Sequence, residues 1–151
     1  MSQVMKRELR SHILVVLQLL GVTASCFPVG MVNRGVMASL ILCVLGGAIG
    51  IYTLLHNKIG NFSIYPEIRP QAVLITTGPY RYVRHPMYVA LCSMMLGIAL
   101  YNGHWINFLG CMLVTVVVLT KASIEEQHLV REFANYRHYA DSTSRFIPKI
   151  Y

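Results

Sequence analysis

The sequence predicts an all-α integral membrane protein that forms one domain over residues 1–151. Hydrophobic residues make up 55% of the 151 positions, charged residues make up 13%, and the mean hydropathy is +0.53. The apolar residues occur in long blocks that lack the polar face of a soluble amphipathic helix. This combination is typical of helices that cross a bilayer and argues against a soluble domain.

Four apolar blocks predict four transmembrane helices, over residues 13 to about 29, 36–55, 86–101 and 105–120. A helix needs about 20 residues to cross a hydrocarbon core of ~30 Å. The last two blocks hold about 16 residues each, which gives helices of only ~24 Å at 1.5 Å per residue. We therefore expect them to start inside the membrane boundary or to thin the bilayer locally. The short links at 30–35 and 102–104 predict that each pair is antiparallel.

The distribution of positive charge predicts which side of the membrane each end occupies. When the N-terminus is placed in the cytoplasm, every lysine and arginine except Arg34 falls on the cytoplasmic side. Cytoplasmic loops carry such an excess, so the chain is expected to be a multi-pass protein with both termini inside. The net charge of +7 does not indicate nucleic acid as a partner, because the basic residues flank apolar segments.

Two stretches are not predicted to cross the membrane. The connection over residues 56–84 contains three prolines and is too long for a simple link, which is typical of a functional loop. Residues 122–140 predict a separate cytoplasmic or interfacial helix, because Leu129, Phe133, Tyr136 and Ala140 form one apolar line at helical spacing.

The second block contains Gly46 and Gly50 in a Gly-x-x-x-Gly pattern. Glycines at this spacing let two helices approach closely. Packing within one molecule is the simpler interpretation, and dimerisation is the alternative.

The chemistry is concentrated in Gly78-Pro79-Tyr80-Arg81-Tyr82-Val83-Arg84-His85-Pro86-Met87-Tyr88, which leads directly into the third apolar block. Ionisable groups are costly at membrane depth, so they indicate a site by default. Pro86 suits the first turn of a helix and biases His85 towards an extended backbone. Each arginine or tyrosine alone could be an interfacial anchor. The cluster as a unit favours a binding site.

The second concentration of polar residues is Glu125-Glu126, shortly after the fourth block. Adjacent residues on a helix point about 100° apart, so the two carboxylates are not expected to share a proton. They could simply occupy the first turn of a helix, where acidic residues are favourable. Alternatively, one carboxylate could hold a cationic group such as an ammonium.

A metal centre is not expected. Glu125 and His128 have the i, i+3 spacing of di-iron bundles, but such bundles need two of these motifs and further carboxylates. A Ser-His-Asp hydrolase is similarly unsupported, because Asp141 is the sole aspartate and no serine has a nucleophile-elbow context.

Two blocks of sequence carry a family resemblance. Leu74-Ile75-Thr76-Thr77 followed by the segment 78–88, and later Glu125-Glu126-x-x-Leu129 with Phe133, Tyr136, Tyr139 and Arg145-Phe146-Ile147-Pro148, resemble the signature of isoprenylcysteine carboxyl methyltransferases and their phospholipid methyltransferase relatives. The resemblance covers roughly residues 50 to 150. It implies an integral membrane enzyme that uses S-adenosylmethionine in a site facing the cytoplasm, built from about residues 56–88 and 121–151.

The resemblance also implies roles for individual residues. The cofactor pocket would be lined by Leu74, Ile75, Tyr80, His85, Pro86, Met87, Tyr88, Glu125 and Glu126. Lys121 falls where some relatives place an arginine that contacts the acceptor, and Arg84 is a second candidate for substrate binding. No catalytic residue is assigned, although His85 would be the nearest base for a thiol or ammonium acceptor.

The sequence departs from the family pattern at two points. Ala72 stands where some relatives have a histidine, and the block after Phe133 is one residue shorter than in the carboxyl methyltransferases. The departures leave the acceptor open.

The expected function is methyl transfer to a lipophilic acceptor in the bilayer, as in isoprenylcysteine carboxyl O-methyltransferases. The alternatives are a phospholipid N-methyltransferase, a small-thiol S-methyltransferase and a non-catalytic membrane scaffold. A sterol-reductase-like enzyme shares a similar corner but is much longer than this chain.

Overall fold

The computed structural model describes residues 3–28, 35–57, 65 and 72–150, and its regular structure is helical, as predicted. The elements in chain order are α1 (Gln3–Cys26), α2 (Val36–His56), the 3₁₀ turn η1 (Gly78–Arg81), α3 (Pro86–Asn102), α4 (Trp105–Glu132) and α5 (Tyr136–Ser142). Most of the predicted connection at 56–84 lies outside the described residues.

Three helices are long and apolar enough to cross a membrane, namely α1 over Arg7–Cys26, α2 and α4. Large apolar side chains cover their outer surfaces: Met37, Val44 and Leu55 on α2 are 72%, 67% and 82% exposed. Side chains of this kind need an apolar solvent, so the protein is a membrane protein. α3 has 17 residues and is shorter, as predicted, so the fourth span and the orientation of the bundle stay predictions.

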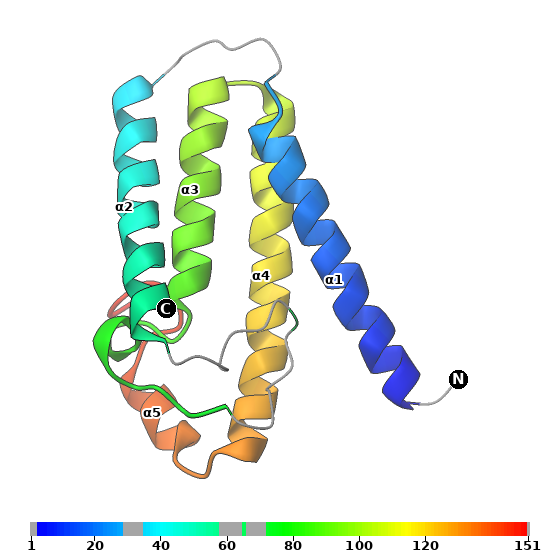
Figure 1. Ribbon diagram of the computed structural model, residues 1–151, viewed down its shortest axis with the longest axis vertical. Coiled ribbons are helices and arrows are strands. Elements are labelled where there is room, and N and C mark those ends of the chain that lie inside the picture. The colour runs from blue at the N-terminus through cyan, green and yellow to red at the C-terminus, as the bar shows by residue number, and fades with distance from the viewer. Residues whose placement is uncertain (1–2, 29–34, 58–64, 66–71, 151) are drawn as a thin grey trace.

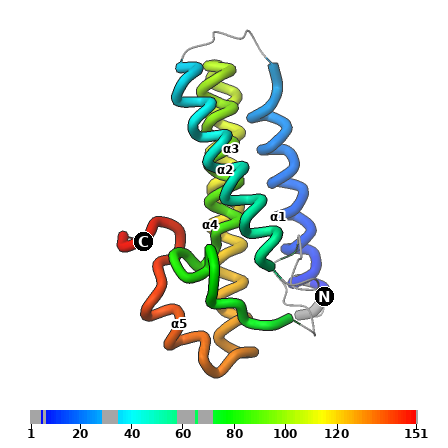
Figure 2. Tube along the Cα trace, turned by 60° about the vertical axis from the view of Figure 1, so that its left-hand side comes forward, coloured from blue at the N-terminus to red at the C-terminus, as the bar shows by residue number. Residues whose placement is uncertain are grey.

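The long helices lie side by side in the order α2, α3, α4, α1 (Figure 1). The first turn of α1 and the short helix α5 lie at the same end of this row in both views (Figures 1 and 2). A chain with both termini on one side of a membrane requires this arrangement. We call this end of the molecule the polar end, because the candidate site lies there.

α1 and α4 cross closely at two glycines and then diverge towards the polar end (Figure 1). A Cβ atom on Gly110 would lie 2.5 Å from the backbone nitrogen of Ser25 and 2.7 Å from the carbonyl oxygen of Gly21. Neither backbone atom can move aside easily, so the absence of side chains sets the distance of approach.

The Gly-x-x-x-Gly pattern serves contacts within the molecule. A Cβ atom on Gly46 would lie 2.8 Å from the carbonyl oxygen of Ala90 and 2.8 Å from Cγ of Met94, both on α3. Gly50 also faces Ala90. The simpler interpretation of this motif is therefore confirmed, and it accounts for the close packing of α2 on α3.

A buried asparagine amide caps the C-terminal end of α1, which lies away from the polar end. Asn107 is fully buried, and its Nδ2 atom lies within 3.0 Å of the carbonyl oxygens of Ala24, Ser25 and Phe27. Asn102 donates to the Ser25 carbonyl as well. The last carbonyls of a helix have no partner within it, so these asparagines satisfy groups that lipid could not.

Two predictions about the C-terminal third were wrong. No separate helix covers 122–140; α4 continues without a break from Trp105 to Glu132, and only the short α5 follows. The expected short fourth span is therefore the start of a 28-residue helix. Phe133 ends α4 with an extended backbone, φ −120° and ψ 110°, and this breaks the predicted apolar line between Leu129 and Tyr136.

Candidate functional site

The segment that leads into α3 is held in place by the end of α2. Gly78 adopts a left-handed conformation with φ +60°, which glycine allows without strain. The ring of His56 lies over it, and a Cβ atom at this position would sit 2.6 Å from ring atoms. Nε2 of His56 also lies 3.0 Å from Oγ1 of Thr77. The chain then makes the η1 turn that carries Tyr80.

The C-terminal segment fastens the same stretch from the other side. The backbone N–H of Arg84 donates to the Ser144 carbonyl at 2.9 Å, and the N–H of His85 donates to the Arg145 carbonyl at 3.2 Å. These bonds accompany a parallel bridge between Val83 and Ser144. The orphan amides ahead of α3 are thereby satisfied, and residues 83–85 are fixed to residues 144–145.

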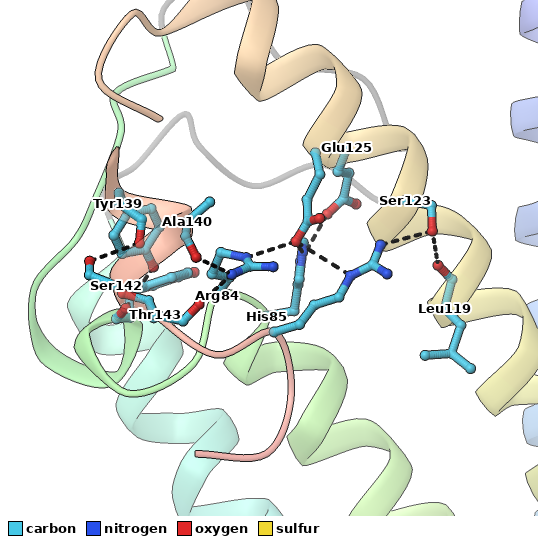
Figure 3. A network of polar contacts seen from close by, with 12 residues as sticks. Arg84, His85, Leu119, Ser123, Glu125, Tyr139, Ala140, Ser142 and Thr143 are labelled. Carbon is cyan, nitrogen blue, oxygen red and sulfur yellow. Dashed lines mark hydrogen bonds and ion pairs between the residues drawn. The ribbon is translucent and has the colours of Figure 1, made fainter. Parts of the chain in front are cut away.

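The Arg84 guanidinium links this segment to both α4 and α5 (Figure 3). Its Nε donates to Oε1 of Glu126 at 2.9 Å, and its Nη1 donates to the carbonyl oxygens of Ala140, at 2.7 Å, and Thr143. The side chain is only 14% exposed. A guanidinium with these contacts braces the site. Arg84 was predicted to bind substrate; in the structure its guanidinium contacts groups of the chain itself, and the substrate role stays a prediction.

Glu125 and Glu126 do not begin a helix. They lie about two turns before the end of α4, so the interpretation as first-turn acidic residues was wrong. Glu125 points towards His85 (Figure 3), and Glu126 pairs with both Arg84 and His85. Oε1 of Glu126 also lies 3.4 Å from Nε of Arg145. The two carboxylates therefore occupy the centre of a charged cluster formed by Arg84, His85, Glu125, Glu126 and Arg145.

His85 is the most enclosed ionisable member of the charged cluster, with 6% of its surface exposed. Its Nε2 lies 3.0 Å from Oε1 of Glu126, and its Nδ1 lies 3.5 Å from Oε2 of Glu125. Burial alone would lower the pKa of His85. The hydrogen bonds and charges of the two carboxylates outweigh burial and raise the pKa above 6.5.

Two aromatic rings stack against this imidazole. Tyr88 stacks against His85 with ring centroids 5.6 Å apart, and Phe146 stacks with centroids 5.5 Å apart. The hydroxyl of Tyr88 donates to Oε1 of Glu125. Arg145 extends the cluster to Oγ of Ser123 at 2.8 Å. Such contacts leave His85 little rotational freedom.

Three tyrosines near the charged cluster are also protonated, and two of them, Tyr136 and Tyr139, are buried. Burial and the charge of Glu125 raise the pKa of Tyr80 to about 12. The hydroxyl of Tyr139 donates to the Tyr80 carbonyl at 2.6 Å, which ties η1 to α5. The hydroxyl of Tyr136 is buried and has no hydrogen-bond partner among the described residues. These groups surround the charged cluster with polar edges and aromatic faces.

The structure brings five of the predicted site residues into this one region and separates others from it. Arg84, His85, Tyr88, Glu125 and Glu126 are in direct contact. Pro86 and Met87 form the first turn of α3. Lys121 instead points towards α1 and is 2% exposed, and its Nζ donates to Oε1 of Gln18 at 2.5 Å.

A pocket of about 850 Å³ lies between the segment before η1 and the end of α4 with α5. It shares Leu74 with the residues predicted for the cofactor, and Tyr139 lines it too. Its other lining residues are Val73, Thr76, Arg81, Glu132, Phe133, Ala134, Asn135, His138, Ser142 and Thr143. Thr143 accepts a hydrogen bond from Arg84, so the pocket adjoins the charged cluster, but none of the five cluster residues lines it.

Sequence reasoning gave no site role to Arg145, Phe146, Ser123 or His56. Arg145 and Phe146 belong to the Arg-Phe-Ile-Pro block, which could have indicated them. Their contacts depend on the return of the C-terminus to the start of α3, which no local pattern predicts. His56 carries no signal in the sequence beyond its place at the end of an apolar block.

The fold and the site together define a class of protein: a helical membrane protein with a charged, aromatic-lined site at one end of its bundle. The family model for phospholipid methyltransferases matches residues 35–136, about two thirds of the chain. The chain therefore belongs to the phospholipid methyltransferase family, a family of membrane methyltransferases. A comparison with curated proteins gives no match. The matched range includes the η1 segment, α3 and Glu125-Glu126, so the suspected family is confirmed.

Proposed function

We propose that this protein transfers a methyl group from S-adenosylmethionine to a lipophilic acceptor at the polar end of the bundle, which faces the cytoplasm. The observation that carries the proposal is the Glu125 carboxylate, which is held by Tyr88 and His85 beside aromatic rings. When bound, the cofactor supplies an activated methyl group. The chain then has to position donor and acceptor, an effect worth up to about 7–11 kcal/mol.

The residues present fit this cofactor. An ionised carboxylate offers roughly four acceptor positions, and two atoms of this chain use positions on Glu125. An ammonium can therefore pair with it. The faces of Tyr80 and Tyr88 suit a sulfonium, because aromatic faces attract cations. Leu74, Ile75, Pro86 and Met87 would supply the apolar contacts, and Glu126 would act through Arg84 and His85.

Lys121 is proposed to meet the acceptor. Its amine donates to Gln18 of α1. The helices α1 and α4 diverge towards the polar end (Figure 1). A lipophilic molecule would approach sideways from the bilayer along this line. A carboxylate acceptor, as in the isoprenylcysteine enzymes, would pair with the lysine and would need no base. This acceptor is the leading candidate.

A phospholipid amine is the second candidate, and the family match is the observation that favours it. Incubation of the purified protein with methyl-labelled cofactor and a membrane extract, followed by identification of the labelled product, separates the candidates. A base-labile methyl ester indicates a carboxylate acceptor. A base-stable methylamine headgroup indicates the phospholipid reaction. Label in neither fraction, from protein that binds the cofactor, would contradict a lipophilic acceptor.

The non-catalytic scaffold makes a contrasting prediction. Replacing Tyr80, His85 or Glu125 by alanine would then alter folding stability and nothing else. The methyltransferase proposal requires these variants to lose product formation in protein that remains folded.

A further inference from the structure

The charged cluster contains one group whose protonation state decides its chemical role. His85 could act as a base towards an acceptor that must lose a proton, because it lies beside the proposed cofactor contact. A base needs an unprotonated ring nitrogen with a free lone pair. The surroundings of both ring nitrogens therefore determine whether His85 can have this role.

Each ring nitrogen of His85 faces a carboxylate, which in its ionised form can only accept hydrogen bonds. Nε2 is 3.0 Å from Oε1 of Glu126, and Nδ1 is 3.5 Å from Oε2 of Glu125. An ionised carboxylate has no proton to donate, so a ring nitrogen facing it is satisfied only when it carries a hydrogen. Neutral imidazole has one N–H and would turn a lone pair towards one of the carboxylates. The imidazolium satisfies both.

The charges around the ring allow this state. Arg84 and Arg145 are the opposing cations, and both point at Glu126. Glu125 faces the imidazole on one oxygen and accepts the Tyr88 hydroxyl on the other. Both arginine ion pairs are made with Glu126, so a positive charge on His85 compensates the carboxylate of Glu125.

The packing also prevents the ring from turning towards an acceptor. Tyr88 and Phe146 stack against it, and the Arg145 backbone holds the backbone N–H of His85. A 180° flip of the ring would put Cδ2 and Cε1 in the places of Nδ1 and Nε2, so both contacts with the carboxylates would be lost.

We propose that His85 is a positioning residue, held as a doubly protonated cation between Glu125 and Glu126, and that it is not the base of the reaction. It fixes the Glu125 carboxylate, the proposed partner of the cofactor's ammonium. The role in cofactor binding rests on the proposed function, whereas the charge state does not. An acceptor that reacts as an anion, such as a carboxylate, suits a site of this kind because it has no proton to lose.

Nitrogen NMR of the full-length protein in lipid nanodiscs, with ¹⁵N-labelled histidine, tests the charge state directly. The His85 signals are assigned by their loss in His85→Gln. We expect the two-N–H pattern of an imidazolium at pH 7.5 and a titration midpoint above the ordinary value of about 6.5. A neutral tautomer at that pH, or a midpoint at or below 6.5, would overturn the proposal whether or not the protein transfers methyl groups.

Two glutamate variants test the cause. Glu126→Gln replaces a carboxylate by an amide and is expected to lower the His85 midpoint. Glu132→Gln makes the same change at an exposed position near the end of α4 and is expected to leave the midpoint unchanged. Equal midpoints in the two variants would contradict the assigned cause.

Kinetics separate positioning from base catalysis. We expect His85→Gln to raise the KM for the cofactor by about tenfold or more, the effect of one charge-assisted interaction, with a smaller change in kcat. Loss of kcat at unchanged KM, together with loss of an acid-side ionisation from the pH profile of kcat, would show that His85 is a base and would overturn the proposal.

Discussion

At the scale of single residues, the site depends on charges that are held by several partners at once. Glu126 receives Arg84, His85 and Arg145 on one carboxylate oxygen. The sequence predicted that Arg84, His85 and the glutamates belong to one site, because ionisable groups flank apolar blocks at membrane depth. It could not predict which cation meets which carboxylate, since that depends on the direction of side chains from three separate segments.

Substitutions at Glu125, the proposed cofactor contact, and at Lys121, the proposed acceptor contact, are expected to have different effects. Glu125→Gln removes the negative charge proposed to pair with the cofactor's ammonium. We expect it to weaken S-adenosylmethionine binding by about 10- to 100-fold, the effect of about 1.5–3 kcal/mol. Lys121→Gln removes a charge directed at α1, and we expect it to leave cofactor affinity within about threefold. Calorimetric titration of both variants measures this, and equal losses would mean that the roles are assigned wrongly.

His85 makes the stability depend on pH in a defined direction. Its folded-state pKa is raised above the unfolded value of about 6.5, so the folded state binds its proton more tightly than the unfolded state does. This contribution is complete below pH 6.5 and is lost as pH rises through the folded pKa. We expect the melting temperature in detergent to fall over this range.

The matching control is His85→Gln, which should flatten that part of the pH profile. His138 is exposed on α5, so His138→Gln should leave the profile unchanged. A wild-type melting temperature that rises with pH above 6.5 would contradict the sign of the effect.

At the scale of secondary-structure elements, glycine contacts and the C-terminal segment decide how the helices meet. The bounds of α2 and α3 agree with the apolar blocks within one residue, because each block ends at a polar or glycine-containing link. α4 was predicted too short. Its last three turns carry polar residues on a helix that leaves the apolar block without a break, and hydropathy alone marks only the apolar part.

The crossing of α1 and α4 predicts the effect of an added methyl group. Gly110→Ala would place a Cβ atom 2.5–2.7 Å from backbone atoms of α1. We expect the helices to separate at a cost of about 1–3 kcal/mol, as found for overpacked interiors. Gly47→Ala is the matched control, since nothing lies within 4 Å of its Cβ position. Thermal unfolding in detergent measures both, and equal melting temperatures would contradict the close crossing.

The C-terminal segment is predicted to be part of the site. A chain that ends after Thr143 loses the backbone bonds to Arg84 and His85, the Phe146 ring and the Arg145 contact with Glu126. We expect loss of cofactor binding and a lower melting temperature. A chain that ends after Ile147 keeps all of these contacts and should bind the cofactor. Binding by the shorter chain would show that the segment is dispensable.

At the scale of the whole molecule, the bundle places a polar site at one end of an apolar row of helices. The all-α class and the membrane location were predictable from composition, because long apolar blocks allow few other structures. The path of the C-terminus was not predictable. It depends on the break at Phe133 and on hydrogen bonds between residues about 60 positions apart in the sequence.

The same architecture explains how one short chain could serve a lipophilic acceptor. The outer faces of α1 and α2 are apolar, whereas the charged cluster lies where α3 begins and α4 ends. In the proposed function, a lipid-soluble acceptor would reach the polar end along these apolar faces.

The central claim is that the cluster of Arg84, His85, Tyr88, Glu125 and Glu126 is a site for S-adenosylmethionine. Isothermal titration calorimetry of the folded full-length protein with this cofactor tests it most directly. We predict saturable heat that corresponds to one site per chain and that is strongly reduced in Glu125→Gln. A well-folded protein that gives no heat of binding, in conditions where its melting temperature is also unchanged by the cofactor, would contradict the claim.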